Sequence, residues 1–335
     1  DVATRFVIVG GGPAGNMAAS YAARYGAEVT LIEREIIGGA AHLLDCIPSK
    51  AMIATGGAMS FTRRIAGMGL EEQSVEVDIE ALTSRIGGIT QHLQANTTQL
   101  LESQGVRLIK GSARLTGPHD IEVTSSKGVE HLTADAILIA TGSSPRVPEW
   151  CYPDGERILT TRHCYPPRIF PKSITVIGSG VTGVEFVHMF SSFGAEVTLV
   201  VSRQQVLPAK DPEVAAVLED DFLKRGVKLL KGARATVTER EGDDVVVRCD
   251  DGRVVRSSHA VLAIGSVPNT EGLGLDAAGV EVDRNGYVVI NTHCQSTQPH
   301  IYAAGDVSGK LPLSSVASMQ RSEEHTSELQ SRGLI

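Results

Sequence analysis

A glycine-rich turn between two apolar segments occurs twice in this chain. Residues 5–9 form a short apolar run, and a six-residue glycine turn, a helical stretch and a second β-branched run follow it up to residue 32. The series begins again at residue 173, and the hexapeptide at residues 26–31 is identical to that at residues 194–199. The glycine turn and the second strand of the later copy each lie 168 residues after their counterparts in the first copy, as residue 194 does after residue 26. This register predicts two βαβ units of one kind and therefore an α/β protein.

Each turn carries three glycines with separate tasks, and these are Gly10, Gly12 and Gly15 in the first copy and Gly178, Gly180 and Gly183 in the second. The first glycine permits the tight turn, the second lets the backbone approach a pyrophosphate, and the third lets helix and strand pack closely. The phosphates then lie at the helix N-terminus, where Pro13 and Ala14 begin the first helix. The pattern predicts two Rossmann-like dinucleotide-binding domains, and the alternative is a pair of purely structural turns.

The two copies differ at the position that contacts the adenosine ribose. Glu33 ends the second strand of the first copy, where a carboxylate accepts both ribose hydroxyls and repels a 2′-phosphate, as suits the adenosine half of FAD. The second copy has Val200 to Arg203 there, without a carboxylate, and Arg203 is able to pair with a 2′-phosphate. This favours NADPH, or use of both nucleotides. Two observations leave the choice open: Arg203 is equally compatible with a solvated loop charge, and Gly183 suits NADH at least as well as NADPH.

Four further motifs complete a recognisable series. They are Cys46-Ile47-Pro48-Ser49-Lys50, Ala140-Thr141-Gly142, Ala263-Ile264-Gly265 and Ala304-Gly305-Asp306. With the paired turns, residues 4–320 resemble the class I pyridine nucleotide-disulfide oxidoreductases. The resemblance implies FAD and NAD(P)H as cofactors and a three-layer ββα fold for each nucleotide domain.

The resemblance also assigns cofactor contacts. It implies that Asp306 accepts a hydrogen bond from a flavin ribityl hydroxyl and that Gly305 lets the backbone approach the isoalloxazine. Gly39 belongs to the same cofactor site, in the segment that leads into Cys46. Thr141-Gly142 and Gly265 end strands at the points where the chain crosses between the two nucleotide domains.

The redox segment departs from the family pattern. The family has two cysteines five positions apart, and here Ala41 replaces the first, so only Cys46 remains and no active-site disulfide forms. In the family, the second of these cysteines lies against the flavin as a charge-transfer thiolate. The resemblance implies that only this role carries over to Cys46. A helix N-terminus and the nearby Lys50 both favour a thiolate, and the alternative is an inert buried thiol.

A lone cysteine in this segment is similar to the NAD(P)H-quinone reductase branch of the family, in which the flavin itself passes electrons on. Lys50 resembles the family lysine beside flavin N5, and Glu185 resembles its ion-pair partner on the nicotinamide side. We expect this pair because an unpaired carboxylate facing the sheet is costly, although solvation of Glu185 on its helix is the alternative.

Charge and composition exclude other classes of function. The formal net charge is -8 without a Lys/Arg-rich stretch, which argues against nucleic acid. The longest apolar runs, such as residues 134–140 and 259–264, are too short to span a membrane. Five cysteines without a CxxC pair, and no signal-peptide pattern, predict a cytoplasmic location. The ten histidines have no zinc-type spacing, so no metal is expected.

The expected domains are an FAD domain over 1–147, an NAD(P)H domain over 148–267 and a return to the FAD domain over 268–320. Residues 321–335 resemble a translated sequencing-library adapter and are expected not to be native protein. Family members continue from here into an interface domain that forms the homodimer. We therefore expect that this domain is missing, that the full-length protein is a homodimer, and that this chain alone is not.

The predicted function is that of an enzyme, a flavoprotein NAD(P)H oxidoreductase that passes hydride to FAD and then electrons to a quinone-like acceptor. Two alternatives remain open. One is a disulfide reductase similar to dihydrolipoyl dehydrogenase, which requires another thiol in place of Ala41. The other is a catalytically silent FAD-binding redox sensor.

Overall fold

The computed structural model describes residues 3–71 and 74–320. It divides into two compact units, the first made of the described parts of 1–44, 89–144 and 267–335, and the second of those of 45–88 and 145–266. Residues 45–88, which the sequence analysis assigns to the FAD domain, thus pack with the second unit. The expectation for the tail at 321–335 falls outside the described residues.

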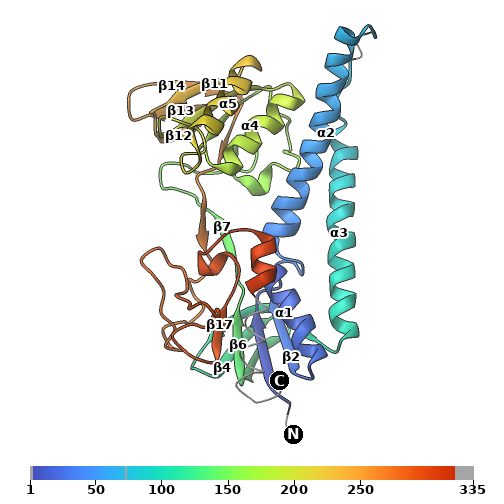
Figure 1. Cartoon of the computed structure of the whole chain (residues 1–335), viewed down its shortest axis with the longest axis vertical. Coiled ribbons are helices and arrows are strands. Elements are labelled where there is room, and N and C mark those ends of the chain that lie inside the picture. Colours follow the sequence, from blue (N-terminus) through green and yellow to red (C-terminus); the bar gives the residue numbers. More distant parts are fainter. Residues whose placement is uncertain (1–2, 72–73, 321–335) are drawn as a thin grey trace. The chain divides into compact units, whose positions relative to one another are not determined.

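A seven-stranded sheet forms the centre of the first unit (Figure 1). Its strands, in spatial order, are β17 (Ile301–Ala303), β6 (Ala136–Ile139), β1 (Arg5–Val9), β2 (Glu28–Glu33), β3 (Arg107–Leu115), β4 (Asp120–Ser125) and β5 (Gly128–Thr133). The first five run parallel, and β4 and β5 extend the sheet as an antiparallel pair. Helix α1 (Pro13–Arg24) packs on β1 and β2, and helix α3 (Ile79–Ser103) enters this unit from the second.

A five-stranded parallel sheet forms the centre of the second unit. Its strands, in spatial order, are β11 (Lys228–Lys231), β10 (Glu196–Val201), β9 (Ser173–Ile177), β15 (His259–Leu262) and β8 (Ile158–Leu159). A separate antiparallel meander contains β12 (Ala235–Glu241), β13 (Asp244–Cys249) and β14 (Val254–Ser257). The unit also holds helices α2 (Ile47–Arg64), α4 (Val181–Phe193) and α5 (Pro212–Lys224).

Short elements complete the chain. They are a π-helix (Ala41–Cys46), three 3-10 helices (Ile65–Met68, Thr161–His163 and Asp306–Ser308), and the paired strands β7 (Ser143–Pro145) and β16 (Ser266–Pro268).

The duplicated units have the same strand register. In the first, β1 pairs with β2 from Arg5 opposite Glu28, and in the second, β9 pairs with β10 from Ser173 opposite Glu196. Both pairings obey the 168-residue offset that the sequence shows. The predicted α/β class, with one Rossmann-like sheet in each unit, is therefore confirmed.

Apolar side chains fill both faces of each parallel sheet, as expected for strands that are covered by other elements on both sides. In the first unit, Ile8 and Leu31 lie on the α1 side, and Val7 and Ile139 lie in the core on the other side. In the second unit, helix α2 packs against α4. Gly56 permits this contact, because a Cβ there would lie 3.2 Å from the Phe193 ring.

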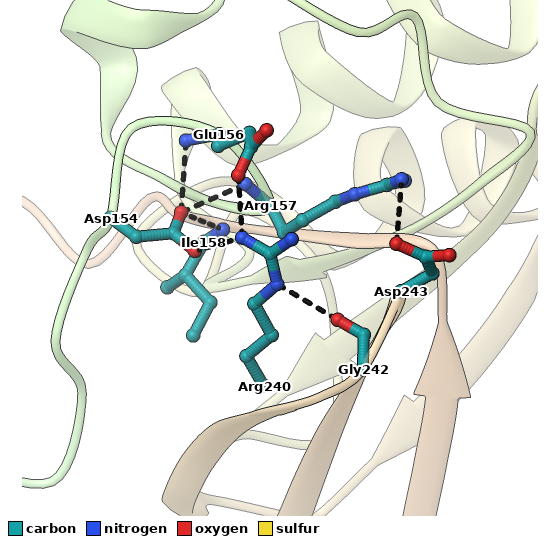
Figure 2. Close-up of polar contacts among 7 residues, drawn as sticks. All are labelled: Asp154, Glu156, Arg157, Ile158, Arg240, Gly242 and Asp243. Carbon is teal, nitrogen blue, oxygen red and sulfur yellow. Dashed lines mark hydrogen bonds and ion pairs between the residues drawn. The ribbon is translucent and has the colours of Figure 1, made fainter.

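A polar cluster anchors the meander of the second unit (Figure 2). One Asp154 carboxylate oxygen accepts the backbone N–H groups of residues 156, 157 and 158 at 2.8–2.9 Å, and these bonds lower the pKa of Asp154 to about 2 against the effect of burial. The Arg240 guanidinium, from β12, donates to the other Asp154 oxygen at 3.2 Å and to Glu156 at 2.6 Å. The cluster therefore ties the segment before β8 to the β12–β13 hairpin.

Among the helices of the described ranges, none is both long and apolar enough to cross a membrane. Over the same residues, no group of three or more His, Cys, Asp or Glu side chains is arranged to hold a metal ion.

Candidate functional site

The first glycine turn has no room for side chains at two of its glycines. Gly10 has a φ of +110°, and a Cβ there would lie 2.2 Å from the carbonyl oxygen of Ala140. A Cβ on Gly15 would lie 2.0 Å from the carbonyl oxygen of Gly10. Gly12 is different: it is the N-cap of α1, and the nearest atom to its Cβ position would be Gly39 Cα at 3.8 Å. Gly10 and Gly15 thus build the turn, and Gly12 leaves space in front of the helix.

Glu33 braces the loop that follows β2. Its Oε2 accepts the backbone N–H of Gly11 at 2.7 Å, and its Oε1 accepts those of Glu35 at 2.6 Å and Ile36 at 3.2 Å. The carboxylate therefore stands directly beside the glycine turn, where the sequence places the ribose contact. An ionised carboxylate is the natural acceptor for several converging N–H donors.

Other predicted residues of the first unit gather at the same turn. A Cβ on Gly39 would lie 2.5 Å from Gly12 Cα and 3.2 Å from Pro13, and one on Gly305 would lie 3.8 Å from the Ala14 side chain. These short distances show that three chain segments far apart in sequence approach one another at the start of α1. At Gly39 this approach leaves no room for a Cβ, so glycine is needed there, whereas a Cβ on Gly305 would be in ordinary van der Waals contact.

Asp306 begins the short helix that follows Gly305. One oxygen of its carboxylate accepts the Ser143 hydroxyl at 2.8 Å, which fixes the side chain. The neighbouring Thr141 donates its hydroxyl to the Asn269 carbonyl at 2.7 Å, and the Asn269 amide donates back to the Thr141 carbonyl at 2.9 Å. Gly142, at a φ of +69°, accepts the Asn269 N–H at 2.9 Å.

Sequence reasoning missed Ser143 and Asn269. A signal was available, because the segments Gly142-Ser143-Ser144-Pro145 and Gly265-Ser266-Val267-Pro268 repeat one pattern after the two exit glycines. Strands β7 and β16, which carry these segments, pair with each other.

The second glycine turn repeats the geometry of the first. Gly178 has a φ of +109°, and its Cβ would lie 2.3 Å from the Ala263 carbonyl oxygen. A Cβ on Gly183 would lie 1.9 Å from the Gly178 carbonyl oxygen. Gly180 is the N-cap of α4, with backbone angles within 5° of those of Gly12, and nothing lies within 4 Å of its Cβ position. The second unit therefore presents the same open helix end.

The loop after β10 carries no carboxylate at the ribose position. Arg203 is exposed there, and its carbonyl accepts the Gly232 N–H at 3.0 Å. Gly265, at a φ of +90°, follows β15 and accepts the Arg146 N–H at 3.0 Å.

Lys50 and Glu185 form the ion pair expected from the sequence. The Lys50 Nζ lies 2.7 Å from Glu185 Oε1, and the two residues come from the first turns of α2 and α4, which pack together. The side chains are 59% and 40% exposed, so the expected burial of Glu185 against the sheet is not observed. Because exposed pairs contribute at most about 1 kcal/mol to stability, this pair has little value for the fold alone.

Cys46 lies one helical turn before Lys50 and caps the start of α2. Its carbonyl accepts the Ser49 hydroxyl at 2.9 Å, and Pro48 occupies the first helical turn. The preceding Asp45 pairs with Arg162 at 2.8 Å, with both side chains about one fifth exposed. This half-buried pair holds the start of α2 within the second unit.

Of the five cysteines, which all lie in the described ranges, Cys46 alone is exposed. Burial raises the pKa of Cys151 to about 11, raises that of Cys164 well above its ordinary value and also raises that of Cys249. Cys294 is 3% exposed. These four thiols are buried, and the exposed sulfur is that of Cys46.

The residues of each unit fit a dinucleotide. The open space at Gly12 and Gly180, in front of helix ends without a side-chain cap, matches a phosphate held by backbone N–H groups. In the first unit the Glu33 carboxylate stands beside that space, and in the second unit the same position lacks an acid. We call each glycine turn, together with the helix end that follows it, a phosphate cradle. The expected FAD and NAD(P)H are compatible with the two cradles.

Comparison with known proteins agrees with this geometry. Residues 4–321 match the family model described as pyridine nucleotide-disulphide oxidoreductase. A protein from Mycobacterium tuberculosis named NAD(P)H dehydrogenase (quinone) is 43% identical over 330 residues, which cover 95% of this chain and 67% of that relative. A dihydrolipoyl dehydrogenase from Zymomonas mobilis is 35% identical, with 94% of this chain and 68% of the relative covered.

A solved structure shows the same fold at similar identity. The crystal structure of LpdA from Mycobacterium tuberculosis superimposes with a TM-score of 0.91 at 41% identity and covers 98% of this chain and 72% of that one. The family match spans nearly the whole chain, and both named relatives exceed 30% identity. The chain is therefore an oxidoreductase that belongs to the pyridine nucleotide-disulphide oxidoreductase family, whose members use FAD and NAD(P)H.

Proposed function

We propose that the chain transfers electrons from NAD(P)H through FAD to a quinone-like acceptor without an active-site disulfide. The observation that carries this proposal is the redox segment, where Ala41 replaces one cysteine and Cys46 is the exposed thiol. A single thiol cannot store two electrons as an intrachain disulfide. The 43% identical relative named NAD(P)H dehydrogenase (quinone) supports the choice of acceptor.

The first unit holds FAD in this proposal. The N–H groups at the start of α1 bind the pyrophosphate across Gly12, Glu33 binds the adenosine ribose, and Asp306 accepts a ribityl hydroxyl. Its carboxylate retains capacity for that bond, because the Ser143 hydroxyl occupies one oxygen only. Bound FAD supplies the two-electron chemistry by accepting hydride from the nicotinamide and delivering electrons to the acceptor.

The second unit holds NAD(P)H, with its pyrophosphate at the start of α4 across Gly180. Glu185 accepts a hydrogen bond from the Lys50 ammonium, which fixes that cation on the first turn of α2. We assign Lys50 to the flavin N5 side and Glu185 to the nicotinamide side. Cys46, one turn before Lys50, tunes the flavin as a thiolate.

NADPH is the nucleotide that the second unit favours. The ribose position has no carboxylate to repel a 2′-phosphate, and the exposed Arg203 is available to pair with it.

For the full-length protein we keep the expectation of a homodimer in the cytoplasm. The cysteine usage supports a reducing compartment. Gel filtration with light scattering of the full-length protein tests the dimer.

Stopped-flow spectroscopy distinguishes the three candidate functions. The FAD-loaded protein is mixed anaerobically with NADPH, and the reduced protein is then mixed with menadione or with lipoamide. We expect rapid bleaching by NADPH, rapid reoxidation by menadione and none by lipoamide. Reoxidation by lipoamide at a comparable rate would establish the disulfide reductase, and failure of NADPH to bleach the flavin would leave the redox sensor.

A further inference from the structure

The loop that follows the second strand is attached to the glycine turn in the same way in both units. In the first unit, the Gly38 N–H donates to the carbonyl of Gly11 at 2.8 Å. In the second, the Leu207 N–H donates to the carbonyl of Ser179, also at 2.8 Å. Gly11 and Ser179 are the second residues of the two turns and obey the 168-residue offset. The loop is therefore held against the phosphate cradle in each case.

This attachment is more costly in the second unit. Both donors have left-handed backbone, with a φ of +111° at Gly38 and +48° at Leu207. Glycine adopts this conformation freely, whereas for leucine it costs on the order of 1 kcal/mol or more. Such a conformation persists when the surrounding contacts impose it, so other interactions must fix the 202–207 loop.

Glu219 supplies those interactions from helix α5. Its Oε1 accepts the backbone N–H of Val206 at 2.9 Å, and its Oε2 accepts the Lys231 ammonium at 2.6 Å. The carboxylate side chain is 13% exposed, and Val206 is fully buried. The residue after Lys231 is Gly232, whose N–H holds the carbonyl of Arg203 at 3.0 Å. Glu219 therefore secures the loop directly at Val206 and, through Lys231 and the adjacent Gly232, at the carbonyl of Arg203.

The two units thus place their bracing carboxylate differently. In the first, Glu33 braces the loop and occupies the ribose position at the same time. In the second, the bracing carboxylate is Glu219 on helix α5, so the ribose position itself carries no negative charge. The Lys231 cation neutralises the Glu219 carboxylate.

From this we infer that Glu219 is a positioning residue for the adenosine end of NADPH: it holds the 202–207 loop so that Arg203 meets the 2′-phosphate. The inference rests on the proposed function, because it takes Arg203 as the phosphate ligand. It assigns Glu219 no contact with the nucleotide. A role confined to stability predicts equal losses for NADPH and NADH, whereas positioning of Arg203 predicts a larger loss for NADPH.

The test compares dissociation constants for NADPH and NADH in the FAD-loaded chain carrying Glu219→Ala, Glu219→Gln or Asp220→Ala. Asp220 is the matched control, since it lies on the same helix in an exposed pair with Lys224. We expect Glu219→Ala to weaken NADPH binding about tenfold more than NADH binding, as loss of about 1.4 kcal/mol of positioning implies. Glu219→Gln keeps an acceptor for Val206 and retains most of the discrimination, and Asp220→Ala changes neither constant.

Arg203→Ala separates this inference from the proposed function. If Arg203→Ala lowers the NADPH preference and Glu219→Ala leaves it unchanged, the inference is wrong and the proposed role of Arg203 stands. If neither variant changes the preference, both are wrong. A shift with Glu219→Ala alone rejects Arg203 as the phosphate ligand and with it the inference as stated. Melting temperatures of all variants show whether the fold is intact.

Discussion

The two nucleotide cradles differ in the side chains around them far more than in their backbones. Gly12 and Gly180 cap their helices with nearly the same backbone angles, and the close approaches at Gly15 and Gly183 agree within 0.1 Å. The bracing carboxylate, in contrast, comes from the end of β2 in one unit and from α5 in the other. The duplicated glycines thus preserve the turn, and we propose that the side chains that differ between the units set which nucleotide each turn accepts.

The largest effect is expected where the duplicated backbone leaves no space. Gly15→Ala and Gly183→Ala place a Cβ 2.0 and 1.9 Å from a carbonyl oxygen of the same turn. We expect each to lower the free energy of unfolding by about 3 kcal/mol or more, because backbone atoms cannot move aside as a flexible side chain does. Chemical denaturation measures the loss.

Gly57→Ala is the control for these variants. Gly57 lies inside α2 with nothing within 4 Å of its Cβ position, and alanine there stabilises the helix by roughly 0.5–1 kcal/mol. A clear difference between Gly15→Ala and Gly183→Ala would show that the two turns are not equivalent in packing.

The next effect separates binding from folding. Gly180→Ala adds a methyl group to open space and Gly12→Ala adds one in ordinary van der Waals contact with Gly39 Cα, so we expect almost unchanged stability for both. The methyl group occupies the place of the phosphate, and we expect affinity to fall by about tenfold or more. Gly12→Ala should reduce FAD content alone and Gly180→Ala the affinity for NAD(P)H alone, as flavin absorbance and nucleotide titration measure. Loss of FAD with Gly180→Ala would contradict the assignment of the two units.

A smaller effect on FAD affinity is expected at Glu33, the carboxylate that braces the loop in the first unit. Glu33→Gln keeps one carbonyl acceptor for the loop but removes the charge that several N–H donors share. We expect FAD affinity to fall about tenfold, since a hydrogen bond to a charged group contributes about 1.5–3 kcal/mol. Fluorescence of released FAD on dilution measures this. Unchanged retention of FAD would show that Glu33 braces the loop without contacting the ribose.

The sequence predicts the repeated parts of the molecule well, because glycine positions and strand patterns are local. Both turns and the strand register follow from these patterns, whereas the Lys50–Glu185 pair is expected from the family resemblance. Glu219 is not predicted although it lies only 13 residues after Val206, because it is one acidic residue on an ordinary amphipathic helix and no local pattern shows that its side chain turns back to the loop. The sequence also overstates the burial of Glu185, because helical spacing alone does not show how far the end of a helix protrudes from its neighbours.

The smallest effect concerns the start of the first strand in each unit. The Arg5 N–H donates to the Asp135 carboxylate at 2.8 Å, and the Ser173 N–H donates to the Ser258 hydroxyl at 3.2 Å. The hydrogen bond from the Arg5 side chain lowers the pKa of Asp135 to about 2. A lowered carboxyl pKa stabilises the fold above the unfolded value near pH 4, and this contribution is lost as the pH falls toward 2.

Asp135→Ser gives the first unit the chemistry of the second at this point. Because the pair is exposed, we expect the variant to lose at most about 1 kcal/mol at pH 7. The difference from the unmodified chain should shrink as the pH falls from 4 to 2. Melting temperatures across this range provide the measurement, and a difference that stays constant with pH would assign the stabilisation to groups other than Asp135.

The most direct test of the account is an anaerobic reductive titration of the FAD-loaded protein with NADPH. We propose that one unit binds FAD and the other NAD(P)H, and the redox segment has one cysteine. One equivalent of NADPH per FAD, which carries two electrons, should therefore complete the reduction. Reduction that requires two equivalents per FAD would reveal a second two-electron centre and contradict the absence of an active-site disulfide.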